Sequence, residues 1–282
     1  MTEQFKPPRG TAYICETCGV QFPESDSPFP QCPICEDFRQ YIGLDGQRWT
    51  ELRELRRTHQ NDIAEIAPGV LSIHTQPKFA IGQRALVVRT PGFNVLWDCV
   101  SLIDDRTIAA VRDFGGISAI AISHPHYYST MLEWSDAFGD APILLHEADR
   151  QWVMRASSNG QRDRIEFWTG NTRPLSNSLT LVHCGGHFEG AQVLHSKSGA
   201  LFTGDVIQVC PDRKWVSFMR SYPNYIPLPA GVVRSIVRAV EPFEFDRLYG
   251  AWPKHEIAAD AKTVTLRSAD RYIHSLTELI VE

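Results

Sequence analysis

Two groups of side chains in this 282-residue sequence have the types and spacing of metal ligands. The first group lies near the N-terminus, where Cys15, Cys18, Cys32 and Cys35 form the pattern C-x2-C-x13-C-x2-C. Each C-x2-C pair can wrap a tight turn that points two thiolates at one ion, and four thiolates complete a tetrahedral shell. Because such a shell leaves no open coordination position, we expect a structural Zn²⁺ here.

The surroundings of these cysteines resemble the metal knuckles of zinc ribbons and rubredoxins, with Gly19 after one pair and Pro33 inside the other. Rubredoxin knuckles lie further apart, and a glycine usually follows the second one, where Glu36 stands in this chain. The resemblance therefore favours zinc over a redox-active iron. Residues 11–38 contain acidic side chains but no lysine or arginine, which argues against binding to nucleic acid. We expect this ribbon to dock on the rest of the chain or on a partner.

The second group combines imidazoles with a carboxylate. His124 and His126 follow an apolar, β-branched run that predicts a buried strand. Side chains two positions apart on an extended backbone lie on the same side, so both rings can converge on one ion. His187 follows two glycines that allow a sharp turn, and Asp205 ends another strand-like run.

The elements that must position these residues alternate along the chain. Apolar runs predict strands at 70–74, 85–90, 93–99, 117–123, 142–146, 179–183, 192–195, 199–204 and 245–250. Helical spacing predicts helices at 51–57, 102–114, 129–138, 147–155, 230–240 and 259–280, and the polar stretch 156–178 predicts a loop. This alternation indicates α/β layers. We divide the chain into a ribbon at 1–40, a connector at 41–68 and a main domain at 69–282.

Composition limits the classes of partner and compartment. Charged residues make up 22% of the chain, hydrophobic residues 43%, and the net charge is −5, so nucleic acid and anionic membranes are not expected as main partners. The sequence has neither a signal-peptide-like start nor an apolar stretch of about 18 residues. Seven cysteines, four of them clustered, fit reduced thiols better than disulfides. We therefore expect a cytoplasmic protein.

In combination, the chemistry-bearing motifs resemble the metallo-β-lactamase superfamily. Asp98 after a strand, His124-x-His126, Gly-Gly-His187-x-x-Gly and Leu-Phe-Thr-Gly-Asp205 occur in the family order over residues 69–255. The resemblance implies an αββα sandwich with a metal cleft along one edge. It also implies that His124, His126, His187 and Asp205 are the ligands of a Zn²⁺ or Fe²⁺ ion in that cleft.

The chain departs from the family pattern at the second metal position. The common motif H-x-H-x-D-H reads His-Pro-His-Tyr-Tyr128-Ser129 here, so an aspartate and a histidine are absent. The last family histidine should fall near residues 250–252, and none is present there. We therefore expect one metal site in the cleft and a degenerate neighbour.

Three functions remain open. The first is a hydrolase of an ester- or thioester-like small molecule, because a zinc site with three imidazoles and an open position lowers the pKa of a bound water to about 7. In this hypothesis Asp205 is a fourth ligand or accepts a proton, and Tyr128 donates a hydrogen bond to an oxyanion. The second is a non-haem iron dioxygenase of the persulfide type that uses His124, His187 and Asp205. The third is a non-catalytic binding or scaffold protein with a vestigial cleft.

The stretch 214–229 combines aromatic residues, prolines and cations shortly after Asp205. One interpretation is a loop over the cleft in which Arg220 or Lys214 holds an acid group of the substrate and aromatic side chains shape the pocket, namely Trp215, Phe218, Tyr222 and Tyr225. The other is a connector that packs on the sheet or on a second subunit, which leaves a homo-oligomer open. For His146 we expect helix capping, and for His183 a structural role.

Overall fold

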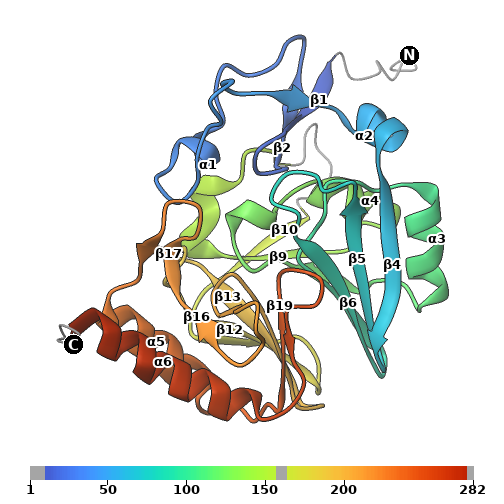
Figure 1. Ribbon diagram of the computed structural model, residues 1–282. Helices are drawn as coiled ribbons and strands as arrows, with labels where there is room; N and C mark the ends of the chain where they lie inside the picture. The colour runs from blue at the N-terminus through green and yellow to red at the C-terminus, as the bar shows by residue number, and fades with distance from the viewer. Residues whose placement is uncertain (1–9, 157–163, 278–282) are drawn as a thin grey trace.

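A computed structural model describes residues 10–156 and 164–277 of the chain (Figure 1). Two β-sheets pack face to face, and helices cover their outer faces. This arrangement is the αββα sandwich that the sequence predicts. Among the described residues, no helix combines the length and the apolar content needed to cross a bilayer.

The first sheet begins with antiparallel hairpins and continues with parallel strands. In spatial order its strands are β10 (Ile165–Trp168), β9 (Ile143–His146), β8 (Ala119–Ala121), β7 (Phe93–Trp97), β6 (Arg84–Thr90), β5 (Val70–Gln76) and β4 (Gln60–Ala67). The pairs from β4 to β7 are antiparallel, whereas β7, β8, β9 and β10 run parallel. The carboxyl ends of these parallel strands therefore meet along one edge of the sheet, where His124 follows β8.

The second sheet carries the other half of the site. Its spatial order is β11 (Thr172–Pro174), β12 (Leu179–His183), β13 (Gln192–Ser196), β14 (Ala200–Gly204), β19 (Arg247–Gly250) and β20 (Glu256–Ile257). His187 lies in the connection between β12 and β13, and Asp205 directly follows β14. Two small hairpins extend from this sheet, formed by β15 (Gln208–Val209), β16 (Val216–Ser217), β17 (Met219–Ser221) and β18 (Ile226–Pro227).

Three apolar layers hold the sandwich together. Side chains such as Trp97 and Phe202 fill the space between the sheets. The first sheet packs outward against α3 (Asp105–Asp113) and α4 (Met131–Ala137). The second packs against α5 (Ala230–Val240) and α6 (Ala261–Thr277), which lie side by side in Figure 1. Asp104 caps α3 by accepting the N–H of Thr107 at 2.7 Å.

The N-terminal segment forms a small sheet of its own. β1 (Thr11–Cys15) lies between β2 (Gln21–Ser25) and β3 (Trp49–Thr50), and the second cysteine pair lies at α1 (Pro33–Glu36). Within the predicted connector 41–68, β3 pairs with β1 of the ribbon and β4 pairs with β5 of the first sheet. Only α2 (Leu52–Thr58) lies between them as a connector.

Two further predictions need correction. The predicted loop at 156–178 contains β10 and β11, while residues 157–163 of that stretch lie outside the described ranges. The predicted helix at 147–155 is the short 3₁₀ helix η2 (Glu147–Trp152). The part of the predicted C-terminal helix beyond residue 277 also lies outside the described residues.

Candidate metal centre

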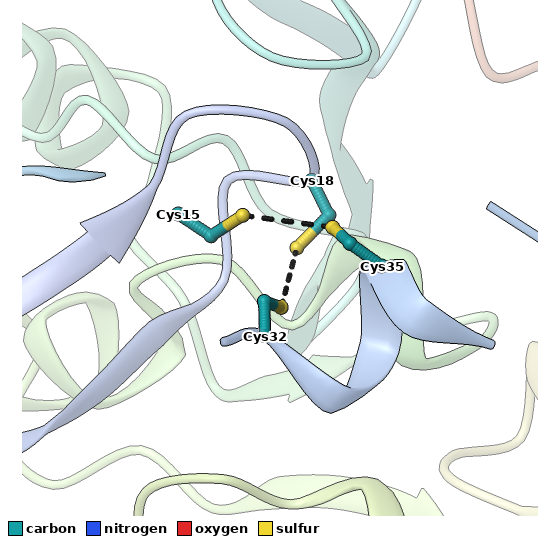
Figure 2. Close-up of side chains that lie close together, drawn as sticks. All are labelled: Cys15, Cys18, Cys32 and Cys35. Carbon is teal, nitrogen blue, oxygen red and sulfur yellow. Dashed lines mark hydrogen bonds between the residues drawn. The ribbon is translucent and has the colours of Figure 1, made fainter. Parts of the chain in front are cut away.

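The four cysteines of the ribbon form one buried cluster (Figure 2). The Sγ atoms of Cys15 and Cys35 lie 3.6 Å apart, and those of Cys18 and Cys32 lie 3.8 Å apart. A tetrahedral site with Zn–S bonds of about 2.3 Å needs sulfur–sulfur separations of about 3.8 Å, so the cluster has the dimensions of a four-thiolate zinc site. Gln47 donates from Nε2 to Cys15 Sγ at 3.2 Å, a contact that helps to orient a ligating thiolate.

The structure brings the second predicted ligand group together as well. His124, His126, His187 and Asp205 are buried, and their ligand atoms all lie within 4.8 Å of one another. His187 Nε2 lies 3.4 Å from His126 Nδ1. This is the edge of a tetrahedron with metal–nitrogen bonds of about 2.1 Å. Asp205 Oδ2 lies 3.8 Å from His124 Nε2 and 3.9 Å from His187 Nε2. The four residues therefore surround one point beside the carboxyl ends of β8 and β14.

The chemistry of the side chains fits an ion at this point. His124 Nε2 is buried and has no hydrogen-bond partner within the described part of the chain. Burial, with a smaller contribution from neighbouring imidazoles, holds the pKa of His124 and of His126 well below the ordinary value. Burial also lowers the pKa of His187 to about 4. All three rings are therefore neutral near pH 7 and present lone pairs, which Zn²⁺ and Fe²⁺ both accept.

His124 is oriented by the residue before it. Ser123 Oγ lies 2.9 Å from His124 Nδ1, which leaves Nε2 free for a metal. The backbone N–H of Ser123 in turn donates to Asp98 Oδ1 at 2.7 Å. Asp98 follows β7 with a φ of +60°, and burial raises the pKa of its carboxyl to about 7. Asp98 therefore supports the site through the backbone that precedes His124.

The backbone between the two neighbouring histidines differs from the prediction. His124 itself is extended, but residues Pro125–Tyr127 form the 3₁₀ turn η1. The prediction that His124 and His126 share one side of an extended strand is therefore wrong. Pro125 is well suited to the first position of a helical turn and cannot continue a β-ladder. The turn brings Nδ1 of His126 toward the other ligands, whereas His124 faces them through Nε2.

Tyr127, and not Tyr128, contacts the site. Tyr127 donates its hydroxyl to Asp205 Oδ1 at 2.7 Å, and the other oxygen of Asp205 faces the imidazoles. Burial raises the pKa of Asp205 to about 7, and the hydrogen bond from Tyr127 opposes that rise. Tyr128 is buried against the ribbon and lines a separate small cavity beside Gln21. Successive side chains of a 3₁₀ turn point about 120° apart, which explains why the predicted oxyanion donor lies away from the ligands.

His187 is presented by the glycine turn that the sequence indicates. Gly185 and Gly186 have φ values of +66° and +88°, and a Cβ on Gly186 would lie 2.8 Å from Ile236 Cδ1. Glycine is therefore required for both conformation and space. His187 Nδ1 lies 3.0 Å from the carbonyl oxygen of Met219, to which it donates a hydrogen bond if Nε2 is the metal ligand.

The positions that would hold a second metal in the resembled family make other contacts here. The carbonyl of Ser129, at the absent-histidine position, accepts the N–H of Gln21 in the ribbon at 3.1 Å. The Oγ of Ser129 accepts from Gln83 Nε2 at 3.3 Å. Trp252, just after β19, stands where the last family histidine is absent and lines the cavity beside the ligands. Where the family would bind a second metal, this chain therefore has a contact between Ser129 and the ribbon on one side and the indole of Trp252 on the other.

A cavity of about 190 Å³ opens onto the ligands, and we call it the metal cavity. It is lined by ligands, by ribbon residues and by residues of three loops: His126, His187, Asp205, Thr17, Gln40, Tyr41, Lys78, Ala80, Ile81, Tyr222, Pro223 and Trp252. The ribbon therefore forms part of the wall of the cavity. No motif in the sequence marked Gln40, Lys78 or Trp252 as cavity residues.

The stretch 214–229 covers the metal cavity only in part. Among its four aromatic residues, Tyr222 lines the cavity. Phe218 is buried in the core of the second sheet, Trp215 lies under the guanidinium of Arg271 at 3.6 Å, and Tyr225 is 84% exposed. These three side chains do not line the metal cavity, so the interpretation as a loop over the cleft fits only Tyr222 among the four aromatic residues.

The two cations to which the loop interpretation assigned an acid group also lie elsewhere. Lys214 does not line the metal cavity, and Arg220 pairs with Glu189 at 3.5 Å outside it. His146 accepts the N–H of Ala148 at 3.3 Å and so caps η2, as predicted. His183 stacks on His146 with ring centroids 3.8 Å apart and is not part of the metal cluster in the described chain.

Comparison with known proteins identifies one extensive sequence relative. The uncharacterized protein YmaE of Bacillus subtilis strain 168 is 49% identical over 271 residues, which cover 94% of this chain and 96% of YmaE. No protein-family model matches the chain.

Solved structures with a similar architecture are much more distant in sequence. VMB-1 has a TM-score of 0.57 at 11% identity, over 77% of this chain and 99% of VMB-1. The metallo-β-lactamase FIM-1 from Pseudomonas aeruginosa, in its mono-zinc form, has a TM-score of 0.55 at 16% identity, over 75% of this chain and 95% of FIM-1. The metal-soaked flavodiiron core of Flv1 from Synechocystis sp. PCC6803 has a TM-score of 0.54 at 12% identity, over 76% of this chain and 61% of that core. These likenesses show a shared fold.

Proposed function

This chain belongs to the family of Bacillus subtilis YmaE and has the metallo-β-lactamase fold, and from this premise we propose that it is a metal-dependent hydrolase of small acyl esters or thioesters. The observation that carries the proposal is the convergence of three neutral imidazoles and one carboxylate within 4.8 Å, at the mouth of a cavity. Zn²⁺ held by His124, His126 and His187 would supply a bound water with a pKa near 7 and would polarise an acyl carbonyl.

The chain's own residues would prepare that reaction. Asp205 would hold the attacking water or accept its proton at Oδ2, while Tyr127 keeps Oδ1 occupied and the carboxylate in place. Tyr222 donates its hydroxyl to the backbone carbonyl of Asp205 at 3.2 Å and so braces the same residue. Trp252 lines the cavity on the side where a second metal would otherwise lie, and its indole would exclude water there.

A second candidate function rests on Asp205. Its Oδ2 lies at similar distances from His124 and His187, 3.8 and 3.9 Å, so these three residues could form a two-histidine, one-carboxylate face for Fe²⁺. The persulfide dioxygenase interpretation would use this face. We prefer the hydrolase because His126 adds a third imidazole, which favours a tetrahedral zinc site.

We extend the proposal to partner and compartment. The metal cavity has a volume of about 190 Å³, which is smaller than the ~300–1,000 Å³ of most ligand pockets. We therefore propose a small molecule as the substrate. No disulfide joins any of the seven cysteines, all of which lie within the described residues, and this supports a reducing compartment such as the cytoplasm. We do not propose nucleic acid or a membrane as a partner, because the ribbon has no lysine or arginine in residues 11–38.

Elemental analysis together with an ester assay tests the hydrolase. We expect purified wild-type protein to hold two zinc equivalents, one for each cluster, and to hydrolyse 4-nitrophenyl acetate. The substitution His124→Ala should remove one equivalent and lower turnover by about 100-fold or more. His59→Ala is the matched control, because His59 belongs to neither cluster.

Other outcomes would assign a different function. Iron bound at the cluster of imidazoles and Asp205, together with consumption of oxygen in the presence of a persulfide, would support the dioxygenase. A single zinc equivalent that His124→Ala leaves unchanged would indicate a vestigial cleft and a non-catalytic protein.

A further inference from the structure

Phe188, the residue after His187, contacts all three imidazoles of the metal centre. The centroid of its ring lies 5.7 Å from that of His124, 4.9 Å from that of His126 and 5.3 Å from that of His187. These separations are those of packed aromatic rings, and Phe188 itself is fully buried. His124 and His126 follow β8 in the first sheet, whereas His187 lies in the β12–β13 connection of the second. The ring therefore packs against ligands from both sheets at once.

Arg39 of the ribbon lies over this ring. Its Cζ is 4.3 Å from the ring centroid of Phe188, and the residue is only 3% exposed. A guanidinium is attracted to the face of an aromatic ring, most strongly where water is excluded. Arg39 Nη2 also donates to both carboxylate oxygens of Glu189, at 3.0 and 3.2 Å. The guanidinium thus contacts two consecutive residues of the loop that carries His187.

The backbone of Arg39 is fixed on both sides of the side chain. Its N–H donates to Asp37 Oδ1 at 3.0 Å, and its carbonyl oxygen accepts from Ser221 Oγ at 2.9 Å. The side chain therefore reaches the loop from an anchored position in the ribbon, between the second cysteine pair and β3.

Ion pairing alone does not explain why Arg39 is buried. Its Nε and Nη1 atoms are buried without a hydrogen-bond partner in the described part of the chain. Burying a charge with unpaired donors is unfavourable unless other contacts offset the loss of water. Glu189 also pairs with Arg220, whose side chain is 31% exposed, so this carboxylate does not need a buried partner. The placement of Arg39 on Phe188 therefore points to a role at the ring.

We propose that Arg39 is a positioning residue of the cleft metal site, which holds the ring of Phe188 against the three imidazoles and so keeps their nitrogen atoms at metal-binding separations. The inference rests on the metal site of the proposed function, and it is independent of the reaction that the metal supports. In this role the ribbon contributes to the metal centre itself, in addition to the wall of the metal cavity.

The zinc affinity of the cleft tests this role. Full-length protein that holds only the ribbon zinc is titrated calorimetrically with Zn²⁺, and His124→Ala gives the baseline without an intact cleft site. Replacing residues that orient metal ligands typically costs about 10- to 100-fold in affinity, so Arg39→Met should weaken cleft binding by about 10-fold or more. The absorption spectrum of Co²⁺ bound in the cleft should also change in Arg39→Met, because this spectrum reports the arrangement of the ligands and not the stability of the fold.

Arg220→Met is the matched control. Arg220 pairs with the same carboxylate, but its guanidinium lies over the ring of Phe38, 4.9 Å from the centroid. This variant should keep the affinity and the cobalt spectrum of the wild type. An unchanged affinity and spectrum in Arg39→Met, or an equal loss in Arg220→Met, would overturn the proposal.

A double-mutant cycle tests whether Arg39 acts through the ring. Phe188→Leu should itself weaken cleft binding, and Arg39→Met should have a much smaller effect in that background than in the wild type. Fully additive losses would contradict the proposal. If Arg39→Met does not fold, Arg39→Lys takes its place, because lysine keeps the charge but lacks the planar group that covers the ring. Cleft affinity should still fall in Arg39→Lys, and wild-type affinity in that variant would again contradict the proposal.

The same measurements separate this inference from the hydrolase proposal. If Arg39→Met binds cleft zinc as the wild type does, and the wild type hydrolyses 4-nitrophenyl acetate, the positioning role fails and the hydrolase remains. If Arg39→Met weakens cleft zinc but the loaded wild type does not hydrolyse the ester, the positioning role remains and the hydrolase fails. A wild-type cleft that binds no zinc would remove both.

Discussion

Individual buried carboxyls around the ligands differ in what they support. Asp98 fixes the backbone before His124, and Asp205 faces the imidazoles directly. Asp149 supports the loop that carries His187, because its Oδ1 accepts the N–H of Gly190 at 2.8 Å. A Cβ on Gly190 would lie 2.7 Å from Asp149 Cγ, so the loop that carries His187 packs directly on this carboxyl.

The titration of Asp149 should make the protein less stable as pH rises. Burial, and to a lesser degree the charge of Glu189, raise its pKa from 3.8 to about 7. The native state therefore holds the proton more tightly than the unfolded state, and this advantage is lost as the pH rises from about 4 through 7. Relative to Asp149→Asn, the wild type should lose on the order of 3 kcal/mol of unfolding free energy between pH 4 and 8.

Urea denaturation of both zinc-loaded proteins across this pH range measures the difference. The metal sites titrate in both proteins, so their contribution cancels in the comparison, and the asparagine keeps an acceptor for Gly190 N–H. Parallel stability curves for the two proteins would contradict the assignment of the raised pKa to Asp149.

At the residue level, motif order predicted the cluster of three imidazoles and one carboxylate but not the residues that support it. The types and sequence context of His124, His126, His187 and Asp205 carry a signal because metal binding restricts the choice of residue. We predicted a role for Tyr128 and missed Tyr127, because two adjacent tyrosines do not show which of them the 3₁₀ turn directs toward Asp205. Gln40 and Lys78 reach the cavity only through tertiary folding, which no local pattern records.

Among the elements, the β17–β18 hairpin positions the segment 38–41, which we call the ribbon tail. Ser221 Oγ donates to the carbonyl of Arg39 at 2.9 Å, and Asn224 Nδ2 donates to the carbonyls of Phe38 and Gln40 at 2.9 and 2.8 Å. The guanidinium of Arg39 lies 4.3 Å from the ring of Phe188, the residue after His187. The hairpin and the ribbon tail thus form one wall beside a metal ligand.

Loosening this wall should affect ligand binding more than metal binding. Asn224→Ala removes both side-chain hydrogen bonds to the ribbon tail and should cost about 1–2 kcal/mol of stability. Because Gln40 and Tyr41 of the tail line the metal cavity, turnover of 4-nitrophenyl acetate should fall several-fold while both zinc equivalents remain. The ester assay and elemental analysis measure the two effects.

Asn177→Ala is the control for this element, because Asn177 is exposed and lies outside the described lining of the metal cavity. It should change neither property. Loss of the cleft zinc in Asn224→Ala would show that the hairpin supports the metal-binding residues themselves and not only the cavity wall.

Strands with a buried apolar face were predictable, and edge strands were not. The sequences of β7 and β12 predict strands because apolar side chains either follow one another or alternate with polar ones, and the apolar side chains are buried in the core. β4 is mostly exposed and lies at the edge of its sheet, so its sequence resembles a polar connector and its pairing with β5 is the main evidence of a strand. The 3₁₀ turn after β8 was also missed, because Pro125 indicates that the strand ends but not which conformation follows it.

For the molecule as a whole, the ribbon is a part of the main core and not an appended unit. Cys15, Val20 and Phe22 of the ribbon pack in the same apolar cluster as Leu71 and Val87 of the first sheet. The lack of basic residues in the ribbon led us to predict that it docks on the rest of the chain or on a partner. The surface on which it packs could not be predicted, because the contacts join segments far apart in the chain. The ribbon occupies the side of the cleft where the second metal site is degenerate.

Because the layers share a core, the ribbon and the sandwich should unfold together. Cys32→Ser should release the ribbon zinc, and the binding free energy of a structural zinc is part of the folding free energy. We expect one calorimetric transition, as in the wild type, with a midpoint lowered by about 10 °C or more. Cys210→Ser is the matched control, since Cys210 is a partly buried cysteine outside the cluster, and it should leave the midpoint nearly unchanged. Two separate transitions in Cys32→Ser, the later one at the wild-type temperature, would show instead that the sandwich is stable without its ribbon.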